Sequence, residues 1–126
     1  MQNASFIVEK TGTGFSAYEE NLPVYTTGNT MDELKVNMLD AINTWRKHKN
    51  LPLITLSDIK ITIDLPQAFE YYKEINAKAI GKRIGMNETL LSQYVNGIKK
   101  PSQKQIEKIL AGIKSLGKEL QQLEFA

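Results

Sequence analysis

The spacing of apolar residues along this chain changes from every second position to every third or fourth, and this change predicts its strands and helices. Two short β-favouring runs, Phe6 to Lys10 and Phe15 to Glu20, flank a glycine-containing turn, and Leu22 to Thr27 is a candidate third strand. In a fourth run every second residue is apolar, at Ile59, Ile61, Ile63 and Leu65. Short strands with one apolar face predict a small antiparallel sheet.

One amphipathic helix is predicted between the third and fourth strands. Thr30 and Glu33 have the spacing of a capping box, in which each side chain accepts a hydrogen bond from the other residue's backbone N–H. Apolar residues then recur at helical spacing while most of the polar residues lie on the other face, and the apolar set is Leu34, Met38, Ile42 and Trp45. We expect this helix to pack on one face of the sheet.

The segment from Ala77 to Ser102 has the residue types of a helix-turn-helix. Gly85 suits the left-handed conformation that ends a helix, and Asn87 is placed to cap the next one. The buried faces of the two helices are predicted to contain Ala79, Ile80, Ile84, Leu91 and Tyr94. Gly97 and the basic residues after it turn the chain into a third helix.

A long terminal helix is predicted to begin at a second capping box, formed by Ser102 and Gln105. Apolar residues follow in a heptad-like pattern, in which the early positions suit the core of the helix-turn-helix domain. The late positions suit a dimer interface, and these are Ile113, Leu116, Leu120 and Leu123. The alternative is a terminal helix that folds back on its own domain.

The predicted fold class is therefore α+β, with two domains. A sheet with one helix occupies residues 1–65, and an all-α helix-turn-helix domain of four to five helices occupies residues 66–126. The charges divide in the same place, because residues 1–65 carry six Lys/Arg against eight Asp/Glu, whereas residues 66–126 carry ten against six. A basic excess confined to the second half supports nucleic-acid binding there.

Exposed polar residues of the helix-turn-helix are the candidate DNA contacts. Base contacts are predicted for Glu88, Thr89, Ser92 and Gln93, and phosphate contacts for Asn76, Lys82, Asn96, Lys99 and Lys100. Glu88 has two interpretations, because a carboxylate accepts from cytosine N4 but is also repelled by phosphate and so discourages non-specific binding. The segment resembles the lambda-repressor and Cro-like (XRE) helix-turn-helix family, which implies binding to double-stranded operator DNA as a dimer or higher homo-oligomer.

The first half resembles the sheet-and-helix domain of HicB-type antitoxins. The matching residues are Thr27-Gly28-Asn29-Thr30 and Asp32-Glu33-Leu34, followed by Asn37, Ala41 and Ile42. The resemblance implies a truncated RNase H-like fold that neutralises a small HicA-like ribonuclease toxin and has no nuclease activity of its own. Together the two halves predict an antitoxin that also represses transcription.

Catalytic chemistry is not expected. The chain has no cysteine, and its single histidine, His48, lies in a charged run with no partner spaced to make it a base or a metal ligand. Asp32 and Glu33 suit a helix N-terminus better than a metal site, so neither a cofactor nor a metal is predicted. Because no apolar stretch approaches the roughly 18 residues of a membrane span and no leader sequence is evident, we expect a cytoplasmic protein without a membrane partner.

Two other functions remain open. A protein-interaction or assembly module could use a helix-turn-helix fold with no specific DNA site, and Leu90 and Val95, which are apolar and predicted to face away from the core, motivate this interpretation. A plain repressor without a toxin partner is the second.

Overall fold

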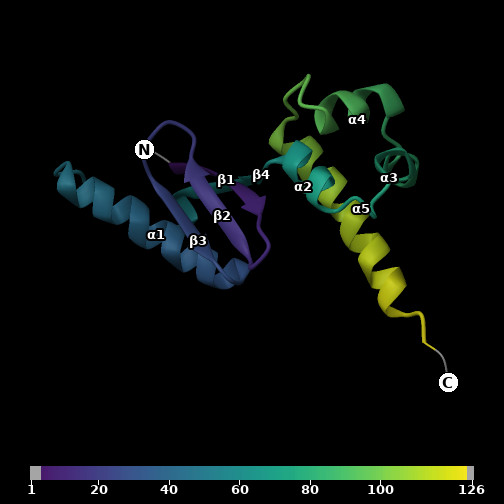
Figure 1. Ribbon diagram of the computed structural model, residues 1–126. Helices are drawn as coiled ribbons and strands as arrows, with labels where there is room; N and C mark the ends of the chain where they lie inside the picture. The colour runs from purple at the N-terminus through teal and green to yellow at the C-terminus, as the bar shows by residue number, and fades with distance from the viewer. Residues whose placement is uncertain (1–3, 125–126) are drawn as a thin grey trace. The chain divides into compact units, whose positions relative to one another are not determined.

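The computed structural model describes residues 4–124, and its contacts divide the chain into two units, Met1–Asp64 and Leu65–Ala126. The predicted boundary lay one residue later. The α+β class is confirmed, since the strands lie in the first unit and most of the helices in the second (Figure 1). The first three residues of the segment assessed for a leader sequence lie outside the described residues.

The first unit contains a four-stranded sheet in the order β3-β2-β1-β4. Its strands are β1 (Ala4–Lys10), β2 (Phe15–Glu19), β3 (Tyr25–Gly28) and β4 (Ile59–Ile63). Neighbours β1, β2 and β3 are antiparallel, but β4 is parallel to β1, so the sheet is mixed and the prediction of an antiparallel sheet is wrong for β4. The reason is that a helix connects β3 to β4, where a hairpin would have reversed the direction of the chain. Strand β4 therefore runs in the same direction as β3 and as its neighbour β1.

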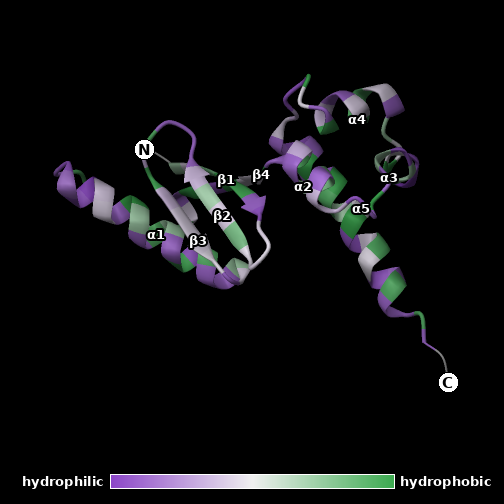
Figure 2. Cartoon of the chain, viewed as in Figure 1, coloured by the Kyte–Doolittle hydropathy of each residue, from purple (hydrophilic) through white to green (hydrophobic). Residues whose placement is uncertain are grey.

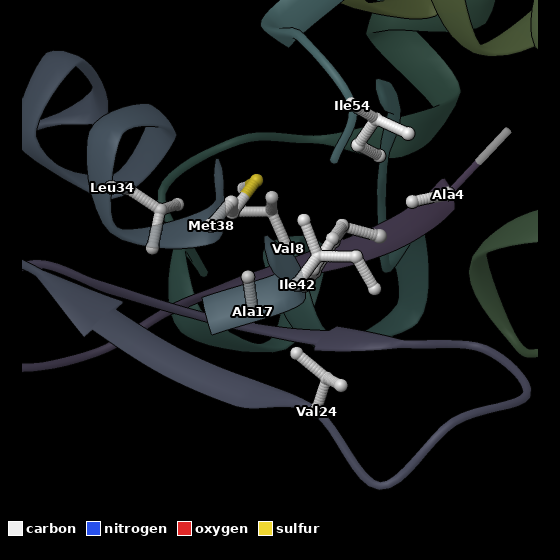
Figure 3. Close-up of a cluster of buried hydrophobic side chains, with 9 residues drawn as sticks. Ala4, Val8, Ala17, Val24, Leu34, Met38, Ile42 and Ile54 are labelled. Carbon is white, nitrogen blue, oxygen red and sulfur yellow. The ribbon is translucent and has the colours of Figure 1, made fainter. Parts of the chain in front are cut away.

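Helix α1 (Met31–His48) covers one face of this sheet. Leu34, Met38 and Ile42 are buried against residues of the strands, as Figure 3 shows. The Thr30 hydroxyl accepts from the backbone N of Glu33, as the capping box predicts. The Glu33 carboxylate, however, accepts from the backbone N of Asn29 and so caps one residue earlier than expected.

The connection from α1 to β4 is held against α1 by two side chains. Asn43 exchanges hydrogen bonds of 2.9 Å with both the backbone N and O of Ile54, which keeps Ile54 in the core. Arg46 is buried although it is charged, and its Nε donates to the Pro52 carbonyl at 2.6 Å. A short 3-10 helix, η1 (Leu56–Asp58), then leads into β4.

The second unit contains four helices within residues 65–124, as predicted. They are α2 (Leu65–Tyr71), α3 (Ala77–Ile84), α4 (Glu88–Val95) and α5 (Gln103–Gln121). Leu65 begins α2 and does not continue the alternating strand, so its predicted place was wrong. Helix α3 packs on α4 and α5, and α2 packs on α4. Within residues 4–124, no helix has both the length and the apolar composition that crossing a membrane requires.

Candidate nucleic-acid interface

Helices α3 and α4 are joined by a tight turn whose residues do what the sequence predicts. Gly85 ends α3 in the left-handed region with φ 68°. The Asn87 side chain then caps α4 by accepting from the backbone N of Leu90 at 3.1 Å. Ile80, Leu91 and Tyr94 are buried, as predicted. Ala79 is exposed, and its predicted place on the buried face was wrong.

The N-terminal turns of α4 carry the predicted base contacts. Glu88, Thr89 and Ser92 are exposed, whereas Gln93 is half-buried. The Gln93 carbonyl accepts from the backbone N of Ile98 at 2.9 Å and of Lys99 at 3.2 Å, so the same residue fixes the turn that follows α4. An exposed polar surface on the first turns of a helix is the arrangement with which helix-turn-helix proteins read a major groove.

A groove of about 360 Å³ lies between the N-terminal turn of α3 and one face of α4, and we call it the α3/α4 groove. It brings together four of the predicted contact residues, Asn76, Glu88, Ser92 and Asn96. Three of them are held by hydrogen bonds within the chain: the Asn76 Oδ1 accepts from the backbone N of Ala79 at 3.1 Å, and the Asn96 Nδ2 donates to the Ser92 Oγ at 3.1 Å. Hydrogen bonds within the chain therefore orient these side chains.

The basic residues predicted to contact phosphate do not all lie together. Lys99 and Lys100 are exposed in the turn after α4. Lys82 lines a different groove, of about 550 Å³, which also contains Arg83 of α3 and Leu116 of α5 and which we call the α3/α5 groove. Lys82 is not among the residues that line the α3/α4 groove, so the structure does not group it with the predicted contact residues there.

Lys78, in the first turn of α3, is a charged residue of this surface that the sequence analysis missed. Its Nζ lies 3.7 Å from the Glu88 Oε1. Because the two residues are ten positions apart and belong to different helices, no helical spacing rule could pair them. Only the packing of α3 on α4 places the two N-terminal turns side by side.

A second unforeseen ion pair joins α3 to α5. The Arg83 guanidinium donates to both carboxylate oxygens of Glu119. Hydrogen bonding and the charge of Arg83 hold the pKa of Glu119 below its ordinary value, and the same hydrogen bond raises the pKa of Arg83. Both groups are exposed to solvent, so the pair contributes little to stability at ordinary ionic strength.

Glu119→Gln should remove part of the acid sensitivity of the second unit. A carboxylate whose pKa is lowered on folding stabilises the fold above its ordinary pKa of 4.5, and that contribution is lost as the pH falls through the lowered value. Thermal melts at low salt, in steps from about pH 7 to about pH 3, should therefore show a flatter decline below about pH 5 for the variant. Glu107→Gln, an equal charge change on α5, should leave the decline as steep as in the wild type.

The apolar residues of α5 become more exposed towards its C-terminal end. Ile106 and Ile109 are buried, Ile113 and Leu116 are half-buried, and Leu120 and Leu123 are 56% and 69% exposed. Figure 2 shows hydrophobic segments along α5 into its last turns. Leu123 follows the C-cap Gln122, so it lies beyond the helix on which it was predicted.

Gly112 is buried on α5 for a reason that the sequence did not reveal. A Cβ added at this position would lie 2.4 Å from the Cγ2 of Ile84 and 3.8 Å from the Cγ2 of Ile80. The glycine therefore allows α3 and α5 to approach closely. Its cost in helix propensity is compensated by this packing.

Within residues 4–124, no three His, Asp or Glu side chains are grouped so that they could hold a metal ion, and His48 is exposed at the end of α1.

Comparisons with protein-family models, with curated proteins and with solved structures find no match to the chain.

Proposed function

We propose that this chain is a cytoplasmic DNA-binding repressor of the antitoxin type. Its second unit binds operator DNA as a homodimer or higher homo-oligomer. Its first unit binds and neutralises a small ribonuclease toxin of the HicA kind. In this proposal the chain has no enzymatic activity, and repression results from occlusion of a promoter.

The observation that carries the DNA-binding proposal is the surface of α4. Exposed Glu88, Thr89 and Ser92 occupy its first turns, and exposed Lys99 and Lys100 follow it within a unit whose sequence has an excess of basic residues. Polar groups on the reading helix suit base edges, and lysines beside it suit phosphates.

The proposed dimer uses the end of α5. Leu120 and Leu123 are exposed there, and Ile113 and Leu116 are half-buried. Apolar side chains that continue past the core of their own unit can be buried by the same helix of a second copy. Two reading helices would then contact half-sites about one DNA turn apart, which strengthens binding to a palindrome.

The toxin-binding proposal is supported by the face of the sheet that α1 does not cover. Tyr18 and Tyr25 are paired across β2 and β3, and they are 36% and 65% exposed. Glu20 is exposed next to β2, and the N-terminal half carries more acidic than basic residues. An aromatic and acidic surface complements a protein that binds RNA through basic residues.

The test is a titration of the purified chain with a fluorescent random duplex and with the duplex from its own promoter. We expect salt-sensitive binding to both, and tighter binding to the promoter. Absence of binding to either duplex at low salt would favour the interaction module. The toxin proposal is tested separately, by co-expressing the chain with a small basic protein encoded beside it. We expect co-expression to relieve the toxicity of that protein. Absence of relief would favour the plain repressor.

The interaction-module alternative has lost part of its support. Leu90 and Val95 are both half-buried, so neither projects fully from α4 as that alternative requires. Val95 also lines the α3/α4 groove beside Ser92 and Asn96. In that position it can contact a thymine methyl group as readily as another protein.

A further inference from the structure

The ion pair between Lys78 and Glu88 lies within the proposed DNA-binding surface. It joins the first turns of α3 and α4, with 3.7 Å between the Nζ and the Oε1, and both residues line the α3/α4 groove. The two side chains are 67% and 49% exposed. Because exposed ion pairs of this kind contribute little to folding, stability does not account for the pair.

Glu88 is also unusual in its charge. It is the only acidic residue between Glu74 and Glu107, a segment that otherwise carries Lys78, Lys82, Arg83, Lys99, Lys100 and Lys104. A carboxylate on a surface that approaches phosphates weakens binding to every duplex by electrostatic repulsion. The repulsion is offset only where a cation lies beside the carboxylate and a base donates a hydrogen bond to it. Lys78 is the cation that lies beside it.

The major-groove edges of the four bases differ in how well they suit a carboxylate. A carboxylate only accepts hydrogen bonds, and cytosine presents an amino group in the major groove with no acceptor of its own beside it. Guanine presents two acceptors, thymine presents one acceptor and a methyl group, and adenine places the N7 acceptor beside its amino group. A carboxylate is therefore favoured by cytosine and repelled, at least in part, by the other three bases.

We propose that Glu88 makes the operator specific for a C·G pair at one position in each half-site, and that Lys78 is a positioning residue that holds the carboxylate towards the base. The inference rests on the proposed DNA-binding function. It assigns Glu88 one of its two roles, base selection, and gives Lys78 a part in specificity.

The experiment selects bound sequences from a randomised duplex pool with wild type and with Glu88→Gln. The wild type should enrich cytosine at one position of each half-site. The variant should enrich adenine there, since an amide both donates to N7 and accepts from N6, and other positions should not change. Affinity of the variant for the wild-type sequence should fall about tenfold, and its affinity for random duplex should rise.

The control for net charge is Glu107→Gln, which should raise affinity for all duplexes alike and leave the selected sequence unchanged. Lys78→Met tests positioning. It should reduce discrimination between C·G and T·A at that position in the wild-type background, and have no effect on discrimination in the Glu88→Gln background. If Lys78→Met lowers affinity for every sequence by the same factor in both backgrounds, Lys78 is a phosphate contact and its positioning role is overturned.

The outcomes separate this inference from the function on which it rests. If wild type and Glu88→Gln select the same sequence, base selection by Glu88 is overturned while DNA binding stands. If the wild type binds no duplex in the pool at low salt, the proposed function and the inference fail together. A cytosine preference that moves to adenine supports both.

Discussion

Replacing Gly112 with valine should lower the free energy of unfolding of the second unit by about 2 kcal/mol. The added Cβ would lie 2.4 Å from the Cγ2 of Ile84, a distance at which one of the helices must move. Ile84 cannot yield by rotation, because a β-branched side chain in a helix has essentially one χ1 rotamer. Urea denaturation followed by circular dichroism would measure the loss.

Gly117 provides a matched control five residues further along α5. It is exposed, and no atom lies within 4 Å of a Cβ added there. Gly117→Ala should therefore raise stability by up to about 1 kcal/mol through helix propensity alone. If Gly112→Val proved neutral or stabilising as well, close packing of α3 on α5 would not be what requires the glycine.

The Gly112 contact also bears on function, because α3 is held from two sides. On one side, Leu91 of α4 packs close to Gly81, where an added Cβ would lie 3.2 Å from the Leu91 Cδ2. On the other side, Gly112 lets Ile84 pack on α5. The Arg83 and Glu119 pair lies on the exposed edge of the same α3–α5 contact. Loosening that contact should disturb the orientation of α3 relative to the end of α5, where the proposed dimer interface begins.

Features that depend on neighbouring residues could be predicted from the sequence. The predicted caps Asn87 and Ser102 each accept the backbone hydrogen bond that their residue type and position indicate. Asn76, which was predicted only as a phosphate contact, caps α3 in the same way. The helical spacing that begins at Leu34 identified the buried face of α1. In these cases the physical cause is a hydrogen bond or a periodicity within a few residues, and one sequence contains all of it.

Features that depend on the packing of separate elements could not be predicted. The parallel pairing of β4 with β1 follows from the path of α1, and the ion pair of Lys78 with Glu88 follows from two helix ends that meet. Lys82 was assigned to DNA from its charge, yet its place depends on how α5 packs on α3. A sequence gives residue types at such positions but not the distances between elements.

In the proposed function, Lys99 and Lys100 contact phosphates and make the largest contribution to DNA affinity. Lys99→Ala combined with Lys100→Ala should lower affinity for promoter and random duplex alike by about 10- to 30-fold at about 0.15 M salt. The reason is counterion release: each phosphate contact contributes about 0.9 to the slope of log K against log salt, so the slope should flatten by about 1.8. Fluorescence anisotropy at several salt concentrations would measure both quantities.

Two comparisons make this prediction specific to the turn after α4. Lys114→Ala with Lys118→Ala removes the same charge from exposed positions on the later part of α5, and should change the slope little. Gln93→Ala should instead weaken promoter binding and relax its sequence preference, with little effect on random duplex or on the slope, because a base contact carries no counterion release. Equal losses from both lysine pairs would mean that only net charge matters. The exposed turns of α4 would then have no fixed orientation towards the duplex. A loss confined to Lys99→Ala with Lys100→Ala would instead place the turn after α4 against the phosphates.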